Sequence, residues 1–142
     1  MISKLNKVLA DELVGMRWLH RAKSQCHDGG QCELLDRILL SCAEICAILE
    51  ETIRRLGGAP VRSQPKPTEE GPQQVSLRDC LQTTESIQRD IIKEINSIVE
   101  SPALADVHDA LLAIRQFHLD NAHWLTEALG AEEQNAAPKP RT

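Results

Sequence analysis

Four polar residues fall where the sequence pattern predicts the buried faces of helices, and their side chains carry atoms that bind protons or metal ions. Glu12 belongs to an apolar series that advances in steps of three and four residues, and His118 and Asn121 belong to another. Such steps place side chains on one face of a helix. Glu85 follows Leu81 by four residues and is expected to face inward as well. A neutral polar group buried without a partner costs about 2 to 7 kcal/mol, so these residues must be paired, protonated or bound to a metal.

The composition predicts one helical domain that does not bind nucleic acid. The chain has 142 residues, which is near the usual size of a single domain. With 16 basic and 21 acidic residues its net charge is -5, and no basic cluster is present to follow a phosphate backbone. It contains one Phe, two Trp and no Tyr, so aliphatic side chains must build the core. Such a core suits packed helices better than a sheet.

Neither a membrane span nor an export signal is expected. No run of about 18 apolar residues occurs. Acidic residues interrupt the N-terminal segment where a signal peptide would stay apolar. The cysteines are odd in number and lack the spacing of a disulfide framework: Cys26, Cys32, Cys42, Cys46 and Cys80. We therefore expect reduced thiols and a cytoplasmic protein.

Apolar periodicity and helix-breaking residues divide the chain into four helices. We expect them at about residues 3–25, 32–57, 76–100 and 102–129, in a bundle that covers residues 1–130. Gly29 and Gly30 are expected to reverse the chain after the first helix, and Gly57 is expected to end the second. The polar, proline-bearing tail over residues 131–142 is expected to be disordered.

A proline-rich segment over residues 59–74 separates two pairs of helices. About fifteen extended residues reach about 50 Å, whereas a helix of about 25 residues is about 37 Å long. The segment is therefore long enough to cross the whole bundle. Its length favours a four-helix bundle with a crossover between the second and third helices over an up-down-up-down arrangement.

Two segments resemble parts of ferritin-like and bacterioferritin-like proteins. Residues 49–60, Leu-Glu-Glu-Thr-Ile-Arg-Arg-Leu-Gly-Gly-Ala-Pro, are similar to the end of the second helix of that family, and residues 121–129 are similar to the end of its fourth. The resemblance implies an all-α, ferritin-like four-helix bundle. In that family, a Glu from each of the first and third helices and a Glu-x-x-His motif from each of the others hold a di-metal centre. The matching positions here are Glu12, Cys42 with Ile45, Glu85, and His118 with Asn121.

Both Glu-x-x-His motifs are replaced in this chain. The second helix has Cys-Ala-Glu-Ile at residues 42–45, and the fourth has His-Leu-Asp-Asn at residues 118–121. Oxygen chemistry at two irons depends on bridging carboxylates and on a histidine for each metal, and Ile45 cannot bind a metal. The sequence therefore weighs against ferroxidase or oxygenase activity in the usual form, and it assigns neither a catalytic residue nor a substrate.

One interpretation of the core is a degenerate metal site in a fold that serves as an assembly or interaction module. In that case Glu12 and Glu85 pair with protonated His118, or with Arg17 or Arg115, and no ion is needed.

The alternative is a protein that binds a single Zn, Fe or Mn ion. Glu12, Glu85 and His118 would supply two carboxylates and an imidazole, and Cys42 would add a thiolate, with Asn121 as their neighbour. Protein purified without added metal distinguishes the two interpretations by its ion content.

The thiols provide a third interpretation. Cys26 and Cys32 flank the first turn, and such a pair could sense an oxidant or bind zinc if it is exposed. Cys42 and Cys46 are four residues apart on one helix face and are expected to fill the core.

A homodimer is the expected assembly, because closed two-fold symmetry is the commonest solution. The apolar residues that lie off the main series are expected to cover its interface: Val8, Leu34, Leu39, Ile48 and Leu112.

Overall fold

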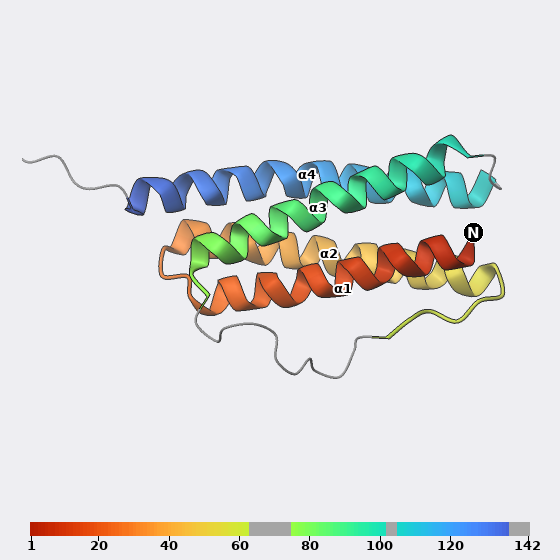
Figure 1. Cartoon of the computed structure of the whole chain (residues 1–142), viewed down its shortest axis with the longest axis horizontal. Coiled ribbons are helices and arrows are strands. Elements are labelled where there is room, and N and C mark those ends of the chain that lie inside the picture. Colours follow the sequence, from red (N-terminus) through yellow and green to blue (C-terminus); the bar gives the residue numbers. More distant parts are fainter. Residues whose placement is uncertain (63–74, 102–104, 137–142) are drawn as a thin grey trace, which may run out of the picture.

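The protein is a bundle of four long helices (Figure 1). The computed structural model describes residues 1–62, 75–101 and 105–136. The helices are α1 (Ile2–Ser24), α2 (Gly29–Arg55), α3 (Leu77–Glu100) and α4 (Ala105–Ala136). Within the described residues there is no strand, and no helix has an apolar stretch long enough to cross a membrane. The expected all-α four-helix bundle is confirmed.

Each helix packs against two neighbours. Helices α1 and α4 both contact α2 and α3, so α1 lies diagonally opposite α4. Helices α2 and α3 run in the same direction, and their connection must pass from one end of the bundle to the other (Figure 1). This arrangement is the crossover topology that the length of the connecting segment predicts, although most of that segment lies outside the described residues.

The core has two apolar halves with a polar layer between them. One half contains Leu5, Leu9, Ile45, Leu49, Ile91 and Leu111, and the other contains Leu19, Leu35, Ile38, Leu81 and Leu125. On α1 the halves are separated at Glu12, and on α4 they are separated at His118 and Asn121. The steps of three and four residues in the sequence correctly predicted that these three side chains are buried.

Two residues expected on an association surface belong to the core instead. Val8 is fully buried, and Leu39 is only 9% exposed. Both lie close to the apolar series of their helices, and the neighbouring helix covers them. The expectation that they face a second subunit is therefore wrong.

Helix α2 begins three residues earlier than the sequence indicated. Asp28 is its N-cap, and the Asp28 carboxylate accepts hydrogen bonds from the backbone N–H groups of Gly30 and Gln31 at 2.9 and 3.2 Å. Gly29 and Gly30 therefore lie in the first helical turn and do not reverse the chain, because a capping aspartate satisfies the free N–H groups there. The chain reversal falls on residues 25–28.

Helix α4 continues beyond the expected end near Leu129. It extends to Ala136, so the prediction that disorder starts at residue 131 is wrong for residues 131–136; residues 137–142 lie outside the described part of the chain. Gly130 has a helical backbone, and the Ala and Glu residues after it favour a helix. Gly57, in contrast, has a φ of 87° and ends α2 as predicted.

Candidate functional site

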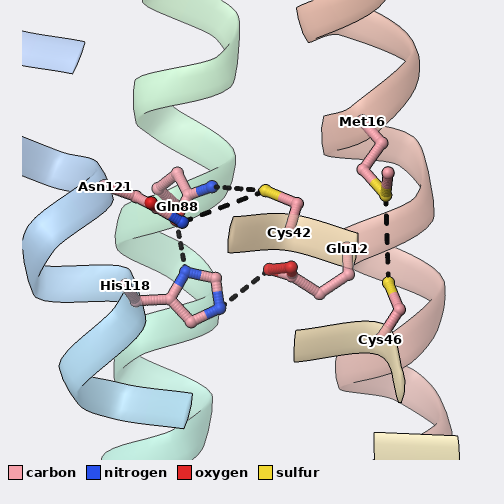
Figure 2. Close-up of polar contacts among 7 residues, drawn as sticks. All are labelled: Glu12, Met16, Cys42, Cys46, Gln88, His118 and Asn121. Atoms are coloured by element: carbon pink, nitrogen blue, oxygen red, sulfur yellow. Dashed lines mark hydrogen bonds and ion pairs between the residues drawn. The ribbon is translucent and has the colours of Figure 1, made fainter. Parts of the chain in front are cut away.

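A carboxylate and an imidazole meet at the centre of the bundle. Glu12 of α1 and His118 of α4 are 1% and 0% exposed, and Glu12 Oε1 lies 2.8 Å from His118 Nε2 (Figure 2). Their helices lie diagonally opposite each other, so the pair spans the middle of the core. Helical periodicity turns both side chains inward, and the bundle brings them into contact.

Gln88 of α3 holds the other side of the imidazole. Its Oε1 atom is hydrogen bonded to His118 Nδ1, and its Nε2 atom donates to Cys42 Sγ at 3.9 Å (Figure 2). Asn121 Nδ2 also donates to Cys42 Sγ at 3.9 Å. All four helices therefore contribute a side chain to one buried polar cluster, which consists of Glu12, Cys42, Gln88, His118 and Asn121.

The contact between Gln88 and His118 determines where a hydrogen must lie. An amide oxygen only accepts hydrogen bonds, so Nδ1 carries the hydrogen in this arrangement. The lone pairs of Nε2 and of Glu12 Oε1 would repel each other at 2.8 Å. A proton between these two atoms removes the repulsion, and a cation bound beside them by both atoms would do the same. With a proton there, the pair is either imidazolium with carboxylate or imidazole with carboxylic acid.

Four buried atoms of the cluster have no hydrogen-bond partner among the described residues: Glu12 Oε1 and Oε2, His118 Nε2 and Asn121 Oδ1. Glu12 Oε1 and His118 Nε2 contact each other as an ion pair, which leaves Glu12 Oε2 and Asn121 Oδ1 as the two acceptors without either kind of partner. A buried acceptor without a partner costs about 1 to 3 kcal/mol, so such atoms favour a water molecule or a cation beside them.

Glu85 does not join the cluster, and the expectation that it faces inward is wrong. Its side chain is 31% exposed, and its Oε1 atom accepts a hydrogen bond from Arg89 Nη2 at 3.0 Å on the surface. The buried face of α3 passes through Thr84 and Gln88. Glu85 follows Thr84 directly, and one residue turns a helix by about 100°.

Sequence reasoning therefore missed Gln88. The signal was present in the series Leu81, Thr84, Gln88, Ile91 and Ile95, which advances in steps of three and four and is buried throughout. A glutamate four residues after a leucine suggested a different phase for the helix. Arg115, another suggested partner for the acids, donates instead to Asn96 Oδ1 at 3.2 Å.

Cys42 lies in the cluster as a neutral thiol. Burial raises its pKa well above the ordinary range of a cysteine, and the charge of Glu12 raises it further. Cys46, one turn later, packs its sulfur 3.9 Å from that of Met16, and burial raises its pKa to about 12 (Figure 2). Both thiols fill the core, in agreement with the sequence interpretation.

The cluster does not fit a di-metal centre. Ile45 and Asn121 stand on α2 and α4 where such a centre needs histidines, and Gln88 stands on α3 where it needs a carboxylate. Among the described residues, no three His, Cys, Asp or Glu side chains gather as metal ligands. The strong donors that remain are the Glu12 carboxylate and His118 Nε2, and the donor set is too small for two ions.

Comparison with known proteins identifies the fold alone. No protein-family model matches the chain, and no curated protein is similar in sequence. Among solved structures, a two-domain protein from Anabaena variabilis that contains DJ-1/ThiJ/PfpI-like and ferritin-like domains matches with a TM-score of 0.73 and 17% identity. The match covers 99% of this chain and 40% of that one, so this chain spans two fifths of the length of the two-domain protein. The chain has a ferritin-like fold.

Proposed function

We propose that this chain is a ferritin-like assembly module whose polar core is held by a proton and two amides in place of a metal centre. The observation that carries the proposal is the position of Gln88, which bridges His118 Nδ1 and Cys42 Sγ. The Gln88 amide thereby connects His118 of α4 to Cys42 of α2, two of the positions where the resemblance implies metal ligands. The fold then keeps its central layer without a di-metal site, and no reaction is assigned to it.

The outer face of α2 is the surface that best suits assembly. Leu40 is 70% exposed there, with exposed Ala43 and Ala47 on the same side of the helix. Ala47 also lines an apolar groove of about 410 Å³ between α2 and α4, together with Ile48 and Val107. We call this surface, Leu40, Ala43, Ala47 and Ile48, the α2 face.

The charges that flank the α2 face favour a second copy of the chain as its occupant. Glu33 and Arg37 lie at one end, and two Glu-Arg pairs over residues 50–55 lie at the other. Antiparallel pairing of two α2 helices about a two-fold axis near Ala43 brings Arg37 alongside the partner's Glu50. The same axis brings Glu33 alongside the partner's Arg54. An isologous dimer is thus complementary in both charge and apolar surface.

Light scattering after size exclusion tests the assembly. Wild-type protein is expected to be a dimer, and Leu40→Glu is expected to be a monomer with an unchanged helical circular dichroism spectrum. Leu119→Glu is the matched control, because Leu119 is 48% exposed on α4 outside the α2 face. A monomeric wild-type protein, or a dimeric Leu40→Glu variant, contradicts the proposed interface.

A single bound ion is the second candidate function, and the unpartnered Glu12 Oε2 atom favours it. Glu12 and His118 Nε2 would hold a Zn, Fe or Mn ion. Gln88 would orient the imidazole through Nδ1, as acceptors of the second N–H do at histidine metal sites. The ion would neutralise the buried carboxylate and orient a water molecule.

Elemental analysis separates the two candidates. If the chain is an assembly module, it is expected to contain much less than one metal ion per chain after dialysis against Zn²⁺, Fe²⁺ or Mn²⁺ and desalting. A metal protein predicts one ion per chain, lost in Glu12→Gln and retained in Glu85→Gln, whose side chain pairs with Arg89 outside the cluster.

The proposed setting is the cytoplasm, and the proposed partner is a second copy of the chain and not nucleic acid. The five free cysteines suit a reducing compartment, and the net charge of -5 disfavours a phosphate backbone.

A further inference from the structure

The turn between α1 and α2 brings two thiols together. Cys26 lies just beyond the end of α1, and Cys32 lies in the first turn of α2, where its N–H donates to Asp28 O at 2.8 Å. Both cysteines are partly exposed, and both contact the Asp28 carbonyl oxygen, which lies 3.4 Å from Cys26 Sγ and accepts the Cys32 N–H. The other three cysteines are buried in the core. This pair is therefore the accessible dithiol among the described residues.

The surroundings distinguish the two sulfurs. Cys26 Sγ also lies 3.4 Å from Asp28 O and 3.5 Å from Gln31 Oε1, and both oxygens accept from its S–H group. Burial and the neighbouring Cys32 raise the pKa of Cys26 to about 12. Cys32 Sγ has no comparable oxygen acceptor among the described residues. Cys26 is thus held as a thiol, and Cys32 is the better placed nucleophile.

We propose that Cys26 and Cys32 form a reversible disulfide when the protein meets a peroxide. This site is independent of the function proposed for the polar cluster. Redox-sensing cysteines are partly exposed and have a resolving thiol beside them. The buried cysteines lack the first of these properties.

The reaction balances with hydrogen peroxide as the oxidant. The Cys32 thiolate attacks one peroxide oxygen, so an S–O bond forms as the O–O bond breaks, and the leaving hydroxide takes up a proton to become water. The Cys26 sulfur then attacks the sulfenic sulfur of Cys32. An S–S bond forms, the S–O bond breaks, and the hydroxyl leaves as a second water with the Cys26 proton. Two electrons pass from the thiols to the peroxide, and a dithiol reductant returns them.

Oxidation at this turn has a route to α4. Gln31 accepts from Cys26 through Oε1, and its Nε2 atom donates to Ala128 O of α4 at 3.0 Å in a buried position. A disulfide removes the S–H donor of Cys26, so the Gln31 amide loses one of its two contacts. The redox state of the turn is thereby coupled to α4 at Ala128.

Trypsin makes the test direct, because one peptide carries both thiols. Cleavage after Lys23 and Arg37 releases residues 24–37, whereas Cys42 and Cys46 are released on residues 38–54 and Cys80 on residues 79–89. The full chain is treated with mild peroxide, blocked with N-ethylmaleimide and digested. The peptide 24–37 is expected to lose two hydrogen atoms and to resist blocking, while the other two peptides stay blocked. Dithiothreitol is expected to restore both thiols.

Two variants determine the roles of the sulfurs. Cys26→Ser is expected to accumulate sulfenic acid at Cys32, seen as a dimedone adduct several times more abundant than in the wild type. Cys32→Ser is expected to form neither that adduct nor the disulfide. Cys80→Ser, on a separate peptide, is expected to oxidise as the wild type does.

Three results overturn the proposal. The first is that the peptide 24–37 keeps both thiols at peroxide doses that oxidise a free cysteine peptide. The second is that the disulfide joins two chains, as a non-reducing gel would show. The third is that Cys32→Ser oxidises at Cys26 as fast as the wild type oxidises. Helical circular dichroism of each variant confirms that it is folded.

Discussion

The polar cluster places an acid and a base in contact where water does not reach. Glu12 and His118 are essentially without exposed surface, and the Glu12 carboxylate and His118 Nε2 have no other partner among the described residues. Taking two such groups out of water costs several kcal/mol for each one that is ionised, and their contact offsets that cost only while both are present. Removing only one of the two side chains is therefore expected to destabilise the protein more than replacing both with apolar residues.

A double-mutant cycle measures this dependence. Glu12→Leu and His118→Leu are each expected to destabilise the protein by about 3 to 5 kcal/mol, because each leaves a buried polar group without its partner. The double variant is expected to lose less than the sum, with a coupling energy of about 0.5 to 3 kcal/mol. Urea unfolding followed by circular dichroism gives the values. Strictly additive losses would show that the two side chains do not interact.

The role of Gln88 is tested against that of Glu85. Gln88→Leu removes the acceptor of the His118 Nδ1 hydrogen and a donor to Cys42, and is expected to cost about 1 to 3 kcal/mol. Glu85→Gln, three residues away, removes a surface ion pair and is expected to change stability by less than about 1 kcal/mol. The same urea experiment serves both variants. Equal losses would mean that α3 presents a different face to the core.

At the scale of the elements, capping explains why α2 starts where it does. The Asp28 carboxylate satisfies two N–H groups that have no acceptor inside the helix. On α3, Ser76 plays the same part through the N–H of Asp79 at 3.1 Å. Asp28 and Ser76 each immediately precede the first residue of their helix. Each cap therefore determines where its helix begins.

Asp28→Ala is expected to destabilise the protein by about 1 kcal/mol, within a range of about 0.5 to 2 kcal/mol for lost caps. Asp28→Asn keeps an oxygen acceptor and is expected to stay close to the wild type. Thermal or urea unfolding reports the difference. If Asp28→Asn falls as far as Asp28→Ala, the negative charge near the helix terminus, and not the hydrogen bonds, provides the stabilisation.

At the scale of the whole molecule, the bundle is two aliphatic halves joined by one polar layer. The halves supply the burial that drives folding, and the layer requires the four helices to align at one height, because each contributes a side chain to it. Leu40, Ala43 and Ala47 of the α2 face are exposed outside both halves, and Ile48 packs against one half. The α2 face is where we propose that a second copy of the chain binds.

The proposed dimer predicts that thermal stability depends on protein concentration. The Tm of the wild-type protein is expected to rise by a few degrees for a tenfold increase in protein concentration, because association favours the folded state by mass action. The Tm of Leu40→Glu is expected to be independent of concentration. Differential scanning calorimetry over such a range gives both results. A wild-type Tm that does not change with concentration contradicts a dimer coupled to folding.

The sequence by itself determined the four helices, the crossover and the inward positions of Glu12, His118 and Asn121. These follow from local periodicity and from breaker residues, which act over a few positions of the chain. The resemblance also implied that both Glu-x-x-His motifs are replaced, and the structure places Ile45 and Asn121 in the buried core.

Only the tertiary structure decided which face of α3 is buried, and hence that Gln88 and not Glu85 meets His118. Each residue turns a helix by about 100°, so an error of one position moves a side chain from the core to the surface. The choice depends on where α1 and α4 lie around α3. The contact of Glu12 with His118 across the diagonal also depends on packing, because it joins residues about a hundred positions apart that no local pattern relates.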